Sequence, residues 1–186
     1  MLEREGFKEV KNLQGGIHAW QGLTAAGSPE AGMAYFHGSR TGGEVILLAR
    51  ELEEGSRRFY SSMAEYVVDK EAADLFSRLA TAEGHHRETL EKLHRELSEG
   101  EMPEEPPDGE HMEGGSLVAE VLVWAREQEV DKIIKWSMAV ETNAYDLYIK
   151  MNRLPGEERI RKVFQVLAKE EKAHLKRLSA LLDQRL

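Results

Sequence analysis

The chain has 186 residues, no cysteine and a formal net charge of −9, and its length is enough for one well-cored domain with a short additional segment. The acidic balance argues against nucleic acid or an anionic membrane as a partner. The lack of cysteine excludes disulfides, thiol catalysis, iron–sulfur clusters and thiolate zinc sites. With neither a membrane-spanning apolar stretch nor the apolar region of a signal peptide, the sequence predicts a soluble cytoplasmic protein.

Residues 1–30 differ in pattern from the rest of the chain. They predict a short strand, a glycine turn and a short helix. This string resembles the C-terminal strand and helix of a rhodanese domain, an enzyme type that transfers sulfur through a cysteine that this chain lacks. We therefore interpret residues 1–30 as a rhodanese-like fragment without that activity, with an unrelated arm as the alternative, and residues 31–41 as a turn-rich linker. The resemblance rests on Gly6, Phe7, Val10, Leu13, Gly15, Gly16 and Trp20.

Residues 42–186 predict an all-α bundle of four long helices, joined by a long crossover that contains an additional short helix. Apolar residues recur every three or four positions in each helical segment. Asp69 is a suitable cap for the second long helix, Ser116 for the short crossover helix and Asp131 for the third long helix. The expected helices cover about residues 43–67, 70–98, 117–128, 131–152 and 157–184.

One pattern of ionisable residues occurs twice in this bundle. A glutamate is followed 30 residues later by a second glutamate, and a histidine follows that glutamate by three positions. The copies are 88 residues apart, and the same offset aligns aromatic and apolar residues, so the pattern belongs to an internal repeat. The two copies are Glu53, Glu83 and His86, and Glu141, Glu171 and His174.

All six residues occupy positions where the helical pattern calls for an apolar side chain. A lone buried carboxylate is destabilising or stays protonated, so four carboxylates that face one core need counter-charge. Two divalent cations would balance the four negative charges, with the two histidines as neutral ligands. We therefore predict a dinuclear site for iron or manganese, which carboxylate and imidazole ligands suit. The alternative is a buried polar network without metal.

Two helix pairs that each contribute one Glu and one Glu-x-x-His form the ligand pattern of ferritin-like di-iron carboxylate bundles. Within this group, residues 41–186 resemble the rubrerythrins and their erythrin-like relatives. The resemblance rests on the strings at residues 53–60, 82–86, 141–148 and 170–174.

The resemblance also implies roles for the ligands. Glu83 and Glu171 would bridge the two metals or nearly so, Glu53 and Glu141 would be terminal ligands, and each histidine would bind one metal. Many rubrerythrins have an extra carboxylate ligand three residues after the glutamate of the third long helix, and this chain has Ala144 there. The site is therefore expected to be symmetric and closer to ferroxidase-type centres.

Several neighbours of the motif need separate interpretation. Tyr60 and Tyr148 follow their glutamates by seven residues, either as partners of the ligand carboxylates or radical traps, or as ordinary core tyrosines. His94 completes another Glu-x-x-His string, but it lies about 12 Å along the helix from the predicted site and is interpreted as unrelated to it. Glu54 and Glu170 adjoin predicted ligands and are expected to be solvated.

The leading hypothesis is a rubrerythrin-type dinuclear non-haem iron protein that reduces peroxide or O2, or oxidises Fe(II). Typical rubrerythrins carry a four-cysteine rubredoxin-like domain, so the resemblance here implies an external electron donor such as a rubredoxin or a flavoprotein. The alternatives are a non-catalytic ferritin-like iron-handling protein and a scaffold that its metals stabilise. Because bundles of this group often pair, we expect a homodimer, with no nucleic acid or membrane as a partner.

Overall fold

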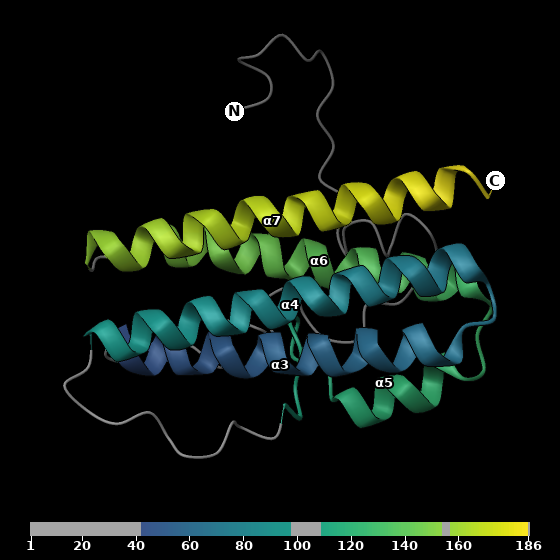
Figure 1. Ribbon diagram of the computed structural model, residues 1–186, viewed down its shortest axis with the longest axis horizontal. Helices are drawn as coiled ribbons and strands as arrows, with labels where there is room; N and C mark the ends of the chain where they lie inside the picture. The colour runs from purple at the N-terminus through teal and green to yellow at the C-terminus, as the bar shows by residue number, and fades with distance from the viewer. Residues whose placement is uncertain (1–41, 98–108, 154–156, 186) are drawn as a thin grey trace, which may run out of the picture.

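The computed structural model describes residues 42–97, 109–153 and 157–185, and the predicted all-α bundle is confirmed there (Figure 1). The predicted strand–helix arm and linker at residues 1–41 lie outside the described residues. None of the described helices is both long and apolar enough to cross a membrane. The helices are α3 (Gly42–Tyr66), α4 (Lys70–Leu97), α5 (Val118–Ala125), α6 (Val130–Arg153) and α7 (Glu158–Asp183).

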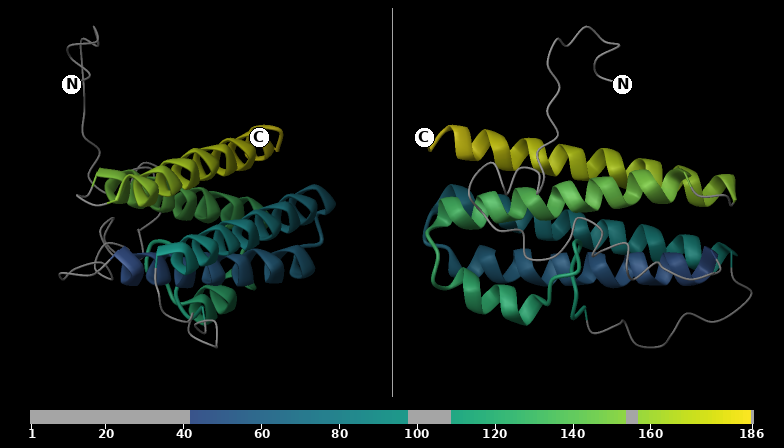
Figure 2. Two further views of the ribbon diagram at one scale, coloured as in Figure 1. Left: turned by 60° about the vertical axis from the view of Figure 1, so that its left-hand side comes forward. Right: turned by 180° about the vertical axis from the view of Figure 1, so that it is seen from behind.

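The four long helices form two pairs, and each pair contains one copy of the sequence repeat. α3 packs along α4, and α6 packs along α7, while contacts between α4 and α7 join the pairs. The short helix α5 lies against α3 on the outside of the bundle (Figures 1 and 2). The amphipathic pattern explains this arrangement, because each long helix has one apolar stripe to bury.

The core consists of two apolar clusters. On every long helix, one end of the apolar stripe contributes to the first cluster and the other end contributes to the second. The residues of the repeated motif stand between these two ends. The repeat is also visible in the packing, because Tyr60 stacks on Phe76 at a centroid distance of 6.0 Å and Tyr148 stacks on Phe164 at 5.7 Å. The bundle therefore places its ionisable residues in one layer between two apolar regions.

One of the three predicted helix caps is confirmed. Asp69 accepts a hydrogen bond of 2.9 Å from the N–H of Ala72 at the start of α4. Ser116 is not a cap, because the N-cap position of α5 is Leu117 and no side chain caps the helix. Ser116 belongs to the hairpin before α5, where its carbonyl accepts a hydrogen bond. Asp131 lies inside the first turn of α6, where its carboxylate binds Nε of Arg185 at 2.6 Å.

The end of the crossover forms a short hairpin, residues 109–117, which we call the crossover hairpin. The N–H of Met112 donates a 3.0 Å hydrogen bond across it to the carbonyl of Ser116. The hairpin lies on the middle of α3, where Gly55 leaves room for the chain. A Cβ at Gly55 would lie 2.1 Å from the carbonyl oxygen of His111, so only glycine permits this approach.

Candidate metal centre

The two copies of the motif meet in the middle of the bundle. α3 and α6 each contribute one glutamate, and α4 and α7 each contribute a Glu-x-x-His pair, whose two side chains share a helix face. None of the six residues is more than 2 % exposed. The structure thus brings together all the predicted ligands: Glu53, Glu83, His86, Glu141, Glu171 and His174.

The six residues form two groups of four that overlap. In each group, every residue offers one ligand atom, and these atoms lie within 4.8 Å of one another. Glu83 and Glu171 belong to both groups, which is the arrangement expected of bridging carboxylates. The groups are Glu53, Glu83, His86 and Glu171, and Glu83, Glu141, Glu171 and His174.

The histidines show how the shared carboxylates are oriented. Nδ1 of His86 lies 3.0 Å from Oε2 of Glu83 and 2.9 Å from Oε1 of Glu171. Nδ1 of His174 lies 3.3 Å and 3.2 Å from the other two oxygens of the same carboxylates. The two imidazole rings stack with their centroids 5.4 Å apart. Each shared glutamate therefore turns one oxygen toward each histidine.

Three carboxylate oxygens in this layer have no well-aligned hydrogen-bond donor within the described part of the chain, although an imidazole Nδ1 lies near each of them. They are Oε2 of Glu83, Oε2 of Glu141 and Oε1 of Glu171, and all three are buried. A buried carboxylate oxygen without a donor is destabilising, and a cation relieves this cost. The donor set of carboxylates and imidazoles fits two iron or manganese ions.

The protonation of the metal-free site follows from burial and from the histidines. Burial raises the pKa of Glu53 and of Glu141 well above the ordinary value. Burial acts in the same direction on Glu83 and Glu171, but hydrogen bonds from the imidazoles lower their pKa overall. The pKa of both histidines is raised, although burial favours the neutral ring, because carboxylates surround them. Two imidazolium rings thus provide the positive charge in this layer.

The two core tyrosines hydrogen-bond predicted ligands across the repeat. The hydroxyl of Tyr60 donates to Oε1 of Glu141, and the hydroxyl of Tyr148 donates to Oε1 of Glu53. Both tyrosines are fully buried, and burial together with the nearby carboxylates raises the pKa of each well above its ordinary value. The structure therefore supports the interpretation that each tyrosine is a hydrogen-bond partner of a ligand carboxylate, and each tyrosine keeps its own proton.

Sequence reasoning missed a fifth buried carboxylate, Glu113 of the crossover hairpin, which is 2 % exposed. Its Oε2 accepts a hydrogen bond from the hydroxyl of Ser56, and its Oε1 lies 3.4 Å from the hydroxyl of Tyr148. Burial and the charges of Glu83 and Glu171 raise its pKa to about 8. The repeat could not reveal this residue, because the crossover has no second copy.

The two glutamates beside the predicted ligands differ in exposure, and only Glu170 is solvated as predicted. For Glu54 the prediction is wrong, because it is 8 % exposed and forms ion pairs with Arg57 at 2.6 Å and Arg87 at 2.9 Å. The side chain of Glu170 is 52 % exposed, yet its Oε2 lies 2.6 Å from Nε2 of His86. Contact between a carboxylate and the outer nitrogen of a histidine orients the ring for a metal.

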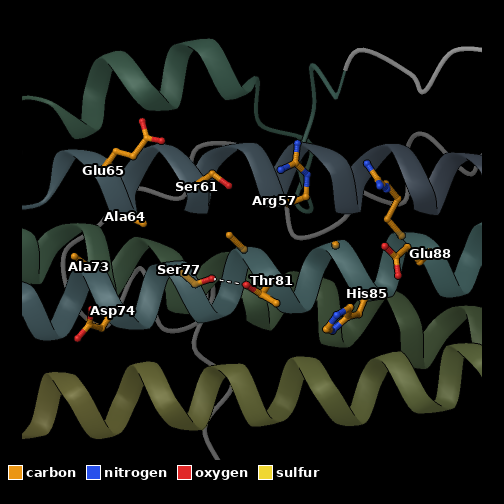
Figure 3. A pocket seen from close by; sticks show the side chains of 13 residues that line it. Arg57, Ser61, Ala64, Glu65, Ala73, Asp74, Ser77, Thr81, His85 and Glu88 are labelled. Carbon is orange, nitrogen blue, oxygen red and sulfur yellow. Dashed lines mark hydrogen bonds between the residues drawn. The ribbon is translucent and has the colours of Figure 1, made fainter.

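The remaining candidates lie apart from the site. His94 is buried but belongs to neither ligand group, in agreement with its interpretation as unrelated. A surface pocket between α3 and α4 is lined by polar and small side chains, including Ser61, Thr81 and His85 (Figure 3). None of the six ligand candidates lines it, so this pocket is separate from the centre.

Comparison with known proteins shows a family match over most of the chain. The family model described as Rubrerythrin matches residues 44–182. Among solved structures, the chain is similar to a hypothetical protein from Pyrococcus furiosus, with 27% sequence identity and a TM-score of 0.61 over 77% of this chain and 89% of that chain. No curated protein matches the chain. The family match begins after residues 1–41, so it gives no support to a rhodanese-like fragment there.

Proposed function

The chain belongs to the rubrerythrin family of ferritin-like di-iron proteins, and we propose that it is an oxidoreductase that reduces peroxide or O2, or oxidises Fe(II). The two overlapping ligand groups that share Glu83 and Glu171 are the observation that supports this proposal most. Two iron ions held by these groups would supply two electrons and polarise the oxygens of a small substrate.

The protein would hold the metals, fix their ligands and exclude water. The shared glutamates and the two histidines provide the cage, while Tyr60 and Tyr148 each hold one terminal glutamate in place. The apolar clusters on both sides of the layer keep bulk water away from it. A buried centre of this kind suits substrates as small as peroxide, O2 or Fe(II).

Electrons would come from another protein. The chain contains no cysteine and so cannot form a rubredoxin-type iron site of its own. We include in the proposal an external donor, such as a rubredoxin or a flavoprotein, and a homodimeric assembly.

Rapid-mixing kinetics tests the function. The protein is loaded anaerobically with Fe(II) and mixed with peroxide or with O2 while the absorbance of ferric iron is followed. We expect oxidation to be much faster than that of free Fe(II) at the same pH, and we expect the Glu83→Ala, Glu171→Ala double variant to lose this advantage. Oxidation of the bound iron no faster than free Fe(II) would contradict the oxidoreductase and leave iron handling or metal-supported stability as the function.

A further inference from the structure

The two halves of the repeat supply equivalent sets of three ligand candidates, but the residues that surround the two sets differ. Glu113 approaches the Glu53 end of the layer, because it contacts the hydroxyl of Tyr148 that donates to Glu53. Ser56, which donates to Glu113, lies one helical turn after Glu53. At the other end of the layer the repeat places Ala144 in the position of Ser56, and alanine offers no such anchor.

A second carboxylate is added at the same end. Glu170 contacts the outer nitrogen, Nε2, of His86 at 2.6 Å. The repeat places Ala82 where Glu170 stands in the other half, so an alanine takes the equivalent position beside His174. A carboxylate on the outer nitrogen of a histidine raises the basicity of the ring toward a metal. Both extra carboxylates therefore act on the position formed around Glu53 and His86.

The carboxylate of Glu113 is only partly satisfied by its hydrogen bonds. Ser56 donates to Oε2, whereas Oε1 has the 3.4 Å contact with Tyr148. A tyrosine hydroxyl has a single proton to donate, and Tyr148 donates it in the much shorter hydrogen bond to Glu53. The described hydrogen-bond partners of the Glu113 carboxylate are thus two hydroxyls and its own backbone N–H, with no cationic side chain among them. Oε1 thus has only a long hydrogen bond and is available for a stronger partner, in a layer where three other carboxylate oxygens have no well-aligned donor.

The backbone of the crossover hairpin is shaped to deliver this side chain. Gly114, directly after Glu113, has a φ of +87°, a conformation that favours glycine. A Cβ on Gly114 would lie 2.8 Å from Nδ2 of Asn143 on α6, while Gly55 admits the other side of the hairpin on α3. Gly55 and Asn143 are themselves 88 residues apart, so the hairpin enters between equivalent positions of the two halves.

We propose that Glu113 is a fifth carboxylate of the metal centre, which binds the metal held by Glu53 and His86 and makes this position the tighter of the two. The inference rests on the dinuclear centre of the proposed function. Four glutamates balance two divalent cations, so an ionised Glu113 adds negative charge beside one position only. A cation at that position gains an oxygen ligand and additional Coulomb attraction.

Anaerobic titration with Co(II), followed by visible absorption and calorimetry, tests this asymmetry. We expect the wild-type protein to bind two Co(II) ions with distinct affinities. Glu113→Gln keeps the size of the side chain and an acceptor for Ser56 but removes the charge. This variant should weaken the tighter site about tenfold or more, change the spectrum of the first equivalent and leave the second site unchanged. Glu110→Gln, on the exposed part of the same hairpin, is the matched control and should behave as wild type.

A second variant and a stability measurement separate a ligand from a structural residue. Glu170→Gln should weaken the same class of site as Glu113→Gln, because it acts at the same end through His86. Unchanged affinities in Glu113→Gln, or equal weakening of both sites together with a lower melting temperature of the metal-free protein, would overturn the inference and leave the dinuclear centre intact. Failure of the wild-type protein to bind any Co(II) would overturn both.

Discussion

The hydroxyl of Tyr148 on α6 donates a hydrogen bond to Glu53 on α3, so a residue of the second half of the repeat holds a ligand candidate of the first half. Tyr60 and Glu141 form the reciprocal bond in the opposite direction. These crossed bonds connect the two helix pairs at the level of the metal centre. The alignment of the pairs and the orientation of the terminal carboxylates are therefore coupled.

Removing either hydroxyl should destabilise the bundle without emptying the site. Tyr148→Phe leaves a buried oxygen of Glu53 without its donor, and Tyr60→Phe does the same to Glu141. Each variant should lower the free energy of unfolding of the metal-free protein by about 1–3 kcal/mol. Denaturant titration measures this loss, and elemental analysis should still find metal. A variant as stable as wild type would contradict the coupling of the two pairs through these bonds.

Two glycines inside long helices, Gly55 and Gly84, should respond differently to replacement by alanine. Gly55→Ala places a Cβ 2.1 Å from a backbone oxygen of the crossover hairpin, and backbone cannot yield as a flexible side chain does. We expect a loss of about 1–3 kcal/mol in stability as the hairpin is displaced. Gly84→Ala is the control, because its Cβ would meet only Cδ of Arg57 at 3.7 Å. The control should gain up to about 1 kcal/mol from helix propensity. Equal thermal stability of the two variants would contradict this packing.

Metal binding should release protons. Four predicted ligands have a raised pKa in the metal-free site, which favours their protonated forms: Glu53, Glu141, His86 and His174. A metal requires its ligands deprotonated, so protons should leave when two divalent cations bind, and affinity should increase with pH. Calorimetry in buffers of different ionisation enthalpy counts these protons. Binding that releases none would show that the ligands are already deprotonated.

A surface contact near the end of the chain should matter little. Arg185 binds Asp69 and Asp131 at 2.6 Å each and joins the end of α7 to the starts of α4 and α6, but all three side chains are partly exposed. Arg185→Ala should lower stability by less than about 1 kcal/mol, and salt should reduce the effect further.

The pH dependence of the stability that this contact contributes follows from the pKa of Asp69. The N–H of Ala72 and then Arg185 hold its pKa below the ordinary value. Its contribution is therefore present above the pKa of an unfolded Asp and is lost as pH falls through the lowered folded value. Thermal melts of wild type and Arg185→Ala across acidic pH measure this contribution. A difference between the two that grows as pH falls would contradict the assignment.

The sequence predicted the bundle and the six ligand candidates because both depend on local periodicity. A glutamate at an apolar position of a helix must face the core, and the repeat at 88 residues showed which glutamates belong together. The same comparison separated His94 from the site. The stacked pairs of Tyr60 with Phe76 and Tyr148 with Phe164 show that the repeat extends to the packing.

What the sequence missed depends on contacts between distant segments. Glu113 is buried because the crossover hairpin packs on Gly55, and nothing near Glu113 in sequence indicates that contact. Glu54 is buried because Arg87 of the neighbouring helix pairs with it. Asp131 has the chemistry of a cap but lies inside the first turn of α6 rather than before it, and its carboxylate meets Arg185 instead. The helix-forming and hydrophobic patterns of the local sequence could not predict these contacts, because each involves a residue far away in the chain.

The central claim is that the buried glutamates and histidines form one dinuclear metal centre. Elemental analysis of anaerobically purified protein, reconstituted with Fe(II) or Mn(II) and freed of excess metal, tests it most directly beside the Glu83→Ala, Glu171→Ala double variant. We expect about two ions per chain in the wild type, as the two ligand groups indicate, and almost none in the variant, because both shared ligands are gone. A wild-type protein that retains no metal after reconstitution, or a variant that keeps both ions, would contradict the account.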